Sequence, residues 1–202
     1  MTNERSASRV PIRRLIAELE RAVPTAERKG NPGLLAALRR LAGQGDAFSP
    51  ESAAIVERFL SDAVRPEEAE AAYIVASLFA LYPYQLHAEH TPPWERSFGR
   101  SLRAIAWREE GSFDPGIERR FMAMLDTPRE ELPHHLRHGI QLLAARRPGV
   151  PVDFVQLFED LLRWEAPGRP VQRRWAEAFW RLEHPEATGE APAEEGPTGS
   201  ES

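Results

Sequence analysis

Apolar residues recur three or four positions apart along almost the whole chain, and this spacing limits what the chain can fold into. Ile12, Leu15, Ile16, Leu19 and Val23 form the first such run and share one face of a helix. Later runs repeat the spacing, and no window alternates apolar and polar residues as a half-buried strand does. The sequence therefore predicts an all-α fold.

Proline and capping residues predict where the helices begin. Proline fits a first helical turn, and Asn, Ser and Asp side chains cap the free amide groups there. Such residues precede apolar runs at Asn31-Pro32, Ser49-Pro50, Pro66, Asp114-Pro115 and Asp153. In the last case Gln156 stands at the reciprocal position of a capping box with Asp153. The run after Pro66 is rich in alanine, which permits close packing, so we expect this helix at the centre.

The segment 127–133 needs a separate interpretation. Thr127-Pro128-Arg129-Glu130 fits a capping box, but Pro133 falls too late for the first turn of a helix begun there. We therefore expect a short turn, followed by a new helix from Pro133.

The chain is expected to divide into two helical parts and a tail. Pro83, Pro92 and Pro93 prevent a continuous helix between Tyr82 and Trp94, so this stretch is interpreted as a link. We predict two packed helical bundles, residues 1–94 and 95–184. The segment 185–202 is poor in apolar residues and rich in Gly, Pro and Glu, and is predicted to be a disordered acidic tail.

The distribution of charge matters more than the net charge of −5. Five of the 31 acidic residues lie beyond Pro185 and no basic residue does, so the rest of the chain carries 26 acidic and 26 basic side chains. All basic residues except Lys29 are arginine, which suits forked phosphate contacts and stacking on bases. A GC-rich genome would explain the same bias without any function.

Several classes of protein are excluded by what the sequence lacks. There is no cysteine, and therefore no disulfide, thiolate zinc site or cysteine nucleophile. There is no phosphate-binding glycine loop, dinucleotide fingerprint or His-Glu-x-x-His motif. Neither a signal peptide nor a run of about 20 apolar residues is present, so the cytoplasm is expected, with no membrane partner. We predict no enzyme and no cofactor.

Two histidine pairs have the spacing of metal ligands. His134 and His138 share one helix face, and His87 and His90 lie in the link. Each pair lacks a third ligand, and surface histidines are the simpler interpretation. We therefore predict no metal site.

Arginines recur in pairs and at helical spacing, notably Arg96, Arg100 and Arg103, which share a helix face. Such a face can follow a phosphate backbone. The alternative is that each arginine pairs with a nearby carboxylate or only solvates its helix. Trp94, after two prolines, could stack on a base or a partner, whereas the four later tryptophans are expected mostly in the core.

Short segments of the second half resemble, in order and spacing, the small subunit (CasB family) of the type I-E CRISPR surveillance complex, Cascade. They are Ser97-Phe98-Gly99-Arg100-Ser101-Leu102, Glu118-Arg119-Arg120-Phe121, Leu136-Arg137-His138, Val150-Pro151-Val152-Asp153-Phe154 and Leu161-Leu162-Arg163-Trp164. Upstream, Leu38-Arg39-Arg40-Leu41 looks like the family's N-terminal part. The match covers about residues 96–181, and the acidic tail is not part of it.

The resemblance implies a non-catalytic subunit that stabilises the displaced non-target DNA strand and the guide–target hybrid. Its implied partners are guide RNA, target DNA, the backbone and large subunits of Cascade, and a second copy of itself. The implied phosphate-contacting residues are Arg39, Arg40, Arg100, Arg119, Arg120, Arg129, Arg137, Arg169 and Arg173. Neighbours on a helix cannot both face one groove, so we expect Arg119 or Arg120 to bind an acidic or backbone group instead.

Two other functions remain open at this point. One is a helical scaffold whose arginines form interface salt bridges without binding nucleic acid. The other is a helical metal-dependent enzyme built on His134 and His138.

Overall fold

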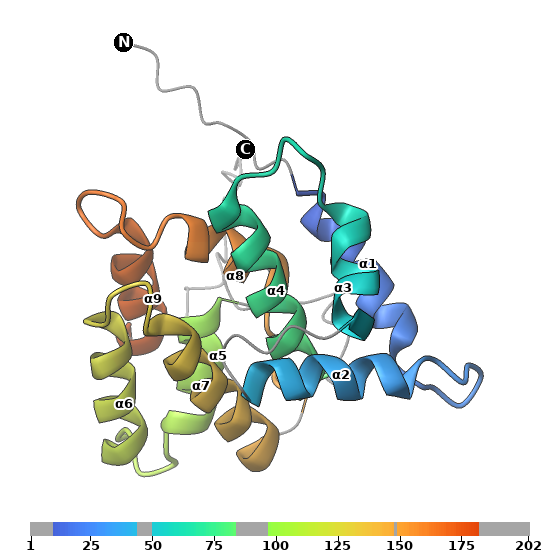
Figure 1. Ribbon diagram of the computed structural model, residues 1–202. Helices are drawn as coiled ribbons and strands as arrows, with labels where there is room; N and C mark the ends of the chain where they lie inside the picture. The colour runs from blue at the N-terminus through green and yellow to red at the C-terminus, as the bar shows by residue number, and fades with distance from the viewer. Residues whose placement is uncertain (1–9, 44–49, 84–96, 148, 182–202) are drawn as a thin grey trace, which may run out of the picture.

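The computed structural model describes residues 10–43, 50–83, 97–147 and 149–181, and within these ranges every regular element is helical (Figure 1). The elements are α1 (Ile12–Ala22), α2 (Pro32–Gly43), α3 (Pro50–Val56), the 3-10 turn η1 (Glu57–Phe59), α4 (Pro66–Leu81), α5 (Phe98–Ala106), α6 (Pro115–Leu125), α7 (Leu132–Arg146), α8 (Phe154–Leu162) and α9 (Pro170–Trp180). The all-α prediction is confirmed. None of the helices described here is long and apolar enough to cross a membrane.

Helix α4 lies at the centre of the molecule, as its alanine content predicts (Figure 1). It packs against α1, α2, α7 and α8. Its small side chains Ala71, Ala72, Ala76 and Ala80 are completely buried. Because these side chains are short, neighbouring helices can approach α4 closely.

The second half of the chain packs tightly around α5. Gly99 of α5 lies against α9, where an added Cβ would be 2.3 Å from the carbonyl oxygen of Trp175. Gly139 of α7 meets the ring of Phe98 in the same way, at 2.8 Å from Cζ. Phe121 of α6 stacks on Phe179 of α9 with ring centroids 4.2 Å apart. These contacts fix α5, α6, α7 and α9 against one another.

One apolar core joins residues from both halves of the chain. Helix α8 packs on α1 and α4, and the ring of Phe154 meets that of Phe79 edge-on at 5.4 Å. The hydroxyl of Tyr82, after α4, donates to the carbonyl of Arg147 and accepts from the amide of Gly149. The predicted boundary near residue 94, the linking segment from residue 84 onward and the tail beyond residue 181 lie outside the described residues.

Most of the helix starts follow the capping prediction. The side-chain oxygen of Asn31 accepts from the amide of Leu34, and that of Asp114 accepts from the amide of Gly116 at 2.9 Å. Asp153 caps α8, but the side-chain nitrogen of Gln156 donates to Asp160. The turn before α7 is present, and that helix begins at Leu132, one residue before the predicted Pro133.

Candidate nucleic-acid interface

Helix α6 presents two neighbouring arginines to solvent. Asp114 caps the helix, and the burial of Ile117 and Phe121 turns Arg119 and Arg120 outward. Arg120 donates from Nη1 to the carbonyl of Gly116, a long contact at 3.4 Å. Arg119 forms no ion pair with any residue that the structure describes. This agrees with the expectation that one member of the pair binds a backbone group.

Helix α7 places histidines beside these arginines. His134 and His138 are one turn apart and exposed, and their ring centroids are 4.3 Å apart. Burial lowers the pKa of His138, and the nearby His134, Arg137, His135 and Arg120 lower it further. All of these neighbours are basic or imidazole groups. Arg120 of α6 and the α7 side chains therefore act on the same region.

Arg137 is half-buried between the two exposed histidines. Its Nε is buried and has no hydrogen-bond partner among the described residues, and the side chain forms no ion pair there. We call Arg120, Arg137, His134 and His138 the α6–α7 surface. Arg119 lies beside it on α6 and projects from a different side of that helix than Arg120.

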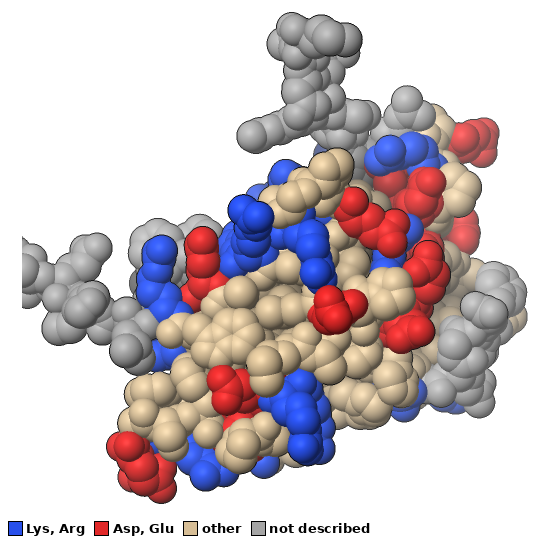
Figure 2. Space-filling model, turned by 90° about the vertical axis from the view of Figure 1, so that its left-hand side faces the viewer, with Lys and Arg blue, Asp and Glu red and all other residues tan. Residues whose placement is uncertain are grey.

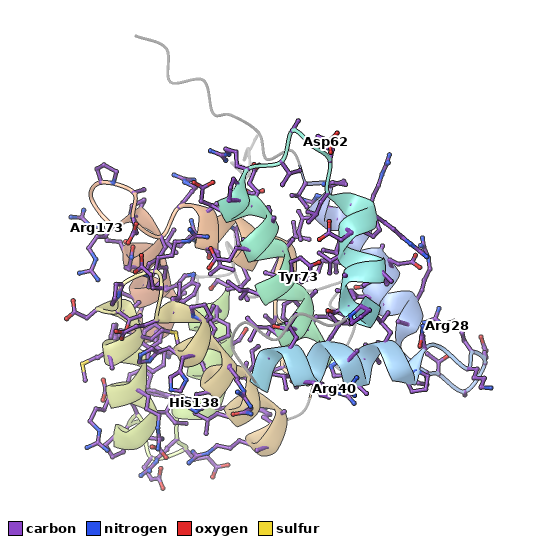
Figure 3. All side chains as sticks on the ribbon, in the orientation of Figure 1. Arg28, Arg40, Asp62, Tyr73, His138 and Arg173 are labelled. Carbon is purple, nitrogen blue, oxygen red and sulfur yellow. The ribbon has the colours of Figure 1, made fainter. Side chains whose placement is uncertain are left out.

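The two arginines of α2 differ from each other. Arg39 donates from Nε to the carbonyl of Ala80, at the end of α4, over 2.7 Å. Arg40 is exposed and has no ion pair within the described part of the chain. Figure 3 shows Arg40 and His138 in the lower part of the molecule and Arg173 at the upper left.

Arg129 and Arg169 are held by carboxylates and carbonyls. Arg129 donates to Glu70 of α4 at 2.9 Å and to the carbonyl of Glu67. Arg169, whose φ of 53° is left-handed, lies 3.4 Å from Asp126 and donates to the carbonyl of Leu125. Their charge is partly neutralised, so each could contact a phosphate only by giving up part of this pairing.

The two remaining predicted residues lie on different helices. Arg100 of α5 is half-buried, and Arg173 of α9 is exposed. Arg173 lines a depression of about 670 Å³ between α6 and α9, which contains Met122, Leu125 and Ala176. Figure 2 looks at this side and shows separate basic groups around an uncharged centre, with acidic side chains among them. This face carries no continuous basic track.

The interpretation of α5 as a phosphate-contacting face fails at Arg103, and the alternative of an internal partner holds there. This side chain is buried and donates to the carbonyl of Phe179 at 2.7 Å. Its guanidinium also lies over the rings of Trp107 and Phe113, at 4.9 and 5.4 Å. Arg103 is thus a structural residue, and Arg96 lies outside the described residues.

Other arginines of the sequence clusters also have internal partners. Arg146 and Arg108 both bind Asp114, and their hydrogen bonds hold the pKa of that carboxyl well below its usual range. Arg174 binds the buried carboxylate of Asp160, which also accepts from the indole of Trp175 at 2.6 Å. Sequence spacing gave no sign of these pairings.

The predictions for the tryptophans and the histidine pairs have mixed outcomes. Trp164 and Trp175 are buried, but Trp107 is 38% exposed, against the prediction that the later tryptophans are mostly core residues. Trp94, His87 and His90 lie outside the described residues. Among the residues that are described, no group of three potential ligands surrounds a common point. His134 and His138 are both exposed, and the prediction that they are surface histidines is confirmed.

The family can now be assigned. The family described as "CRISPR-associated protein Cse2" matches residues 34–180, which run from α2 to the end of α9. The chain belongs to the Cse2 family. The family predicted from the short segments is thereby confirmed, and the match also includes the first half of the chain.

Individual relatives agree with this assignment. A CRISPR-associated protein Cse2 from Thermus thermophilus is 34% identical over 146 residues, which are 72% of this chain and 77% of the relative. The crystal structure of CasB from Thermus thermophilus has a TM-score of 0.64 at 31% identity, over 85% of this chain and 98% of that one. A chain of a CRISPR RNA-guided surveillance complex shares the fold, with a TM-score of 0.59 at 21% identity, over 83% and 88%.

Proposed function

We propose that this Cse2-family chain is the non-catalytic small subunit of a type I-E Cascade. In this role it holds the displaced non-target DNA strand and the guide–target hybrid by their phosphates. Its partners are then guide RNA, target DNA, the backbone and large subunits, and a second copy of itself. The solved surveillance complex that contains a chain of this fold supports the assembly.

The observation that carries the proposal is the set of exposed guanidinium groups without carboxylates. Arg119 and Arg40 are exposed, and neither has an ion pair within the described residues. Arg120 has only a long contact to a carbonyl. A charge that is already solvated and unpaired gives up little when it meets a phosphate, and it releases counterions from the nucleic acid. Paired arginines lack this advantage.

The predicted contact set can therefore be ordered by environment. The α6–α7 surface and Arg119 beside it form the centre of the proposed site, and Arg39 and Arg40 of α2 extend it. Arg100 and Arg173 are secondary candidates on α5 and α9. Arg129 and Arg169 are proposed to orient the surrounding helices, because each already has an acidic partner.

Modest contacts of this kind are sufficient for the role. Opening a target duplex and pairing one strand with guide RNA is nearly balanced in free energy. A subunit that holds the other strand by a few phosphates can shift that balance without any chemical step. Sequence preference is not expected, because phosphate contacts do not read bases.

A helical scaffold that does not bind nucleic acid is the alternative. The ion pairs of Arg129 and Arg169 show that some arginines of this chain do serve packing. A scaffold of this kind would have little affinity for single-stranded DNA at low salt. Strand-holding predicts an affinity that falls steeply as salt rises.

The decisive experiment is reconstitution with guide RNA and the partner subunits of the complex. Target opening is measured by permanganate reactivity of the displaced strand. Three samples are compared: the wild-type chain, no chain, and the variant R119A/R120A/R137A. We expect opening to depend on the chain and to fall with the variant. If the variant assembles normally and opening is unchanged, the strand is not held at this surface.

A further inference from the structure

A small cavity between α6 and α7 combines an apolar lining with basic side chains. It has a volume of about 160 Å³, roughly five times the share of one water molecule in the liquid. Its lining includes Phe121 and Leu142, together with Arg120, His134 and His138. A tetrahedral oxyanion fits such a space, and the guanidinium and imidazole groups can donate to it.

The histidines that line the cavity differ in their partners. His134 and His138 are exposed and face each other edge-on. His135 is half-buried, and its Nε2 lies 3.0 Å from the hydroxyl of Thr127. His134 and His138 have no such hydrogen bond within the described chain and can turn toward a ligand.

Every charged or titratable group that acts on His138 here is basic or imidazole. His134, His135 and Arg137 come from α7 itself, and Arg120 comes from α6. From α5, the cavity receives only Leu102. Helix α4 also packs against α7 but contributes no lining residue. An anion complements this arrangement of groups.

We propose that this cavity receives a backbone phosphate of single-stranded nucleic acid, held by Arg120 and by the imidazoles of His134 and His138. Binding then takes up a proton from solvent onto His138. The proposal rests on the proposed function and makes its affinity depend on pH.

The direction of the pH effect follows from the neighbours of His138. Burial and basic neighbours lower its pKa, which favours the neutral ring in the free chain. A bound phosphate favours the imidazolium and raises that pKa. The complex then holds more protons than the free chain between the two pKa values. Affinity must rise as pH falls through this interval, by up to about tenfold per pH unit for each proton.

The test is the affinity for fluorescent single-stranded oligothymidylate at about pH 8 and about pH 6, at constant ionic strength. The wild-type chain and H134Q/H138Q are compared by anisotropy. We expect the affinity of the wild-type chain to rise between the higher and the lower pH, and that of the variant to rise much less, because the variant lacks the imidazole of His138 that takes up the proton. At the lower pH the wild-type chain should bind about tenfold more tightly than the variant. Imidazole NMR signals should show the pKa of His138 rising when the oligonucleotide binds.

The matched control is H135Q, because His135 is engaged by Thr127. This variant should keep the wild-type response to pH. If H134Q/H138Q keeps it as well, or if H135Q loses it, the histidine pair does not hold a phosphate. If the wild-type chain binds no oligonucleotide at either pH, the proposed function fails as well. The two failures are therefore distinguishable.

Discussion

The arginines of α6 and the arginines packed against α8 and α9 have the same chemistry but opposite surroundings. Arg119 is solvated and has no carboxylate partner among the described residues, and Arg120 has only a long carbonyl contact. Arg174 binds the buried Asp160, and Arg103 lies over two aromatic rings while donating to a carbonyl. The function of an arginine in this fold is thus determined by its neighbours in space.

The buried carboxylate of Asp160 explains why Arg174 has an internal partner. Burial raises its pKa, while Arg174 and the donors Gln156 and Trp175 oppose this shift. Only 2% of Asp160 is exposed, so its charge depends on these donors rather than on water. Arg174 is therefore committed to packing α9 against α8 and is not available to a phosphate.

The largest expected effect is a loss of stability in the variant D160A. The change leaves the indole nitrogen of Trp175, the amide of Gln156 and the guanidinium of Arg174 without their shared acceptor. We expect a loss of about 3 kcal/mol in the free energy of unfolding. Urea denaturation followed by circular dichroism measures it. The folded fraction should bind single-stranded DNA as before.

The control for this change is E177A, which removes an exposed carboxylate of α9. It should alter stability by less than about 0.5 kcal/mol. A similar loss in both variants would mean that the Asp160 network contributes nothing special to the packing of α9.

The second largest expected effect is weaker binding of single-stranded DNA by the variant R119A/R120A/R137A. Three lost phosphate contacts should weaken single-stranded DNA binding at low salt by about tenfold or more. They should also reduce the slope of log affinity against log salt by about 2. Stability should change little for the two exposed residues. Anisotropy titrations over a series of salt concentrations measure both quantities.

The matched control removes the same number of charges from the other end of the molecule. Arg14, Arg21 and Arg58 are exposed on α1 and η1, and Arg21 pairs with Glu18. R14A/R21A/R58A changes net charge equally but should leave most of the affinity in place. Equal losses in the two triple variants would indicate a general charge effect and no defined site.

The difference between the solvated arginines and those with internal partners also shows what the sequence could and could not predict. Helix starts were predictable because Asp114 and Asp153 act on amides two or three residues away. The partners of arginines were not, because Arg129 meets Glu70 from 59 residues away and Arg103 meets Phe179 from 76 residues away. Local spacing contains no information about such contacts, so the interpretation of the α5 face failed at Arg103.

A third and smaller effect concerns Arg129, which the resemblance places among the phosphate contacts. Its side chain ties the turn before α7 to α4 through Glu70, whose own side chain is largely exposed. We expect R129A to cost about 0.5 kcal/mol of stability and to change DNA affinity by less than about twofold. A double-mutant cycle with E70A measures the coupling. A large loss of DNA affinity with no coupling would move Arg129 into the binding surface.

The smallest expected effect on stability comes from removing residues 186–202. The segment contains five glutamates and no basic residue, and its few apolar side chains offer little surface to bury. Its removal should leave the midpoint of thermal unfolding unchanged within about 1 °C. At low salt it should also strengthen DNA binding modestly, because the net charge of −5 becomes neutral. A fall of several degrees in the midpoint would show that the segment packs against the helices. In that case the acidic region, like the arginines of α5 and α9, would owe its role to neighbours that its composition does not reveal.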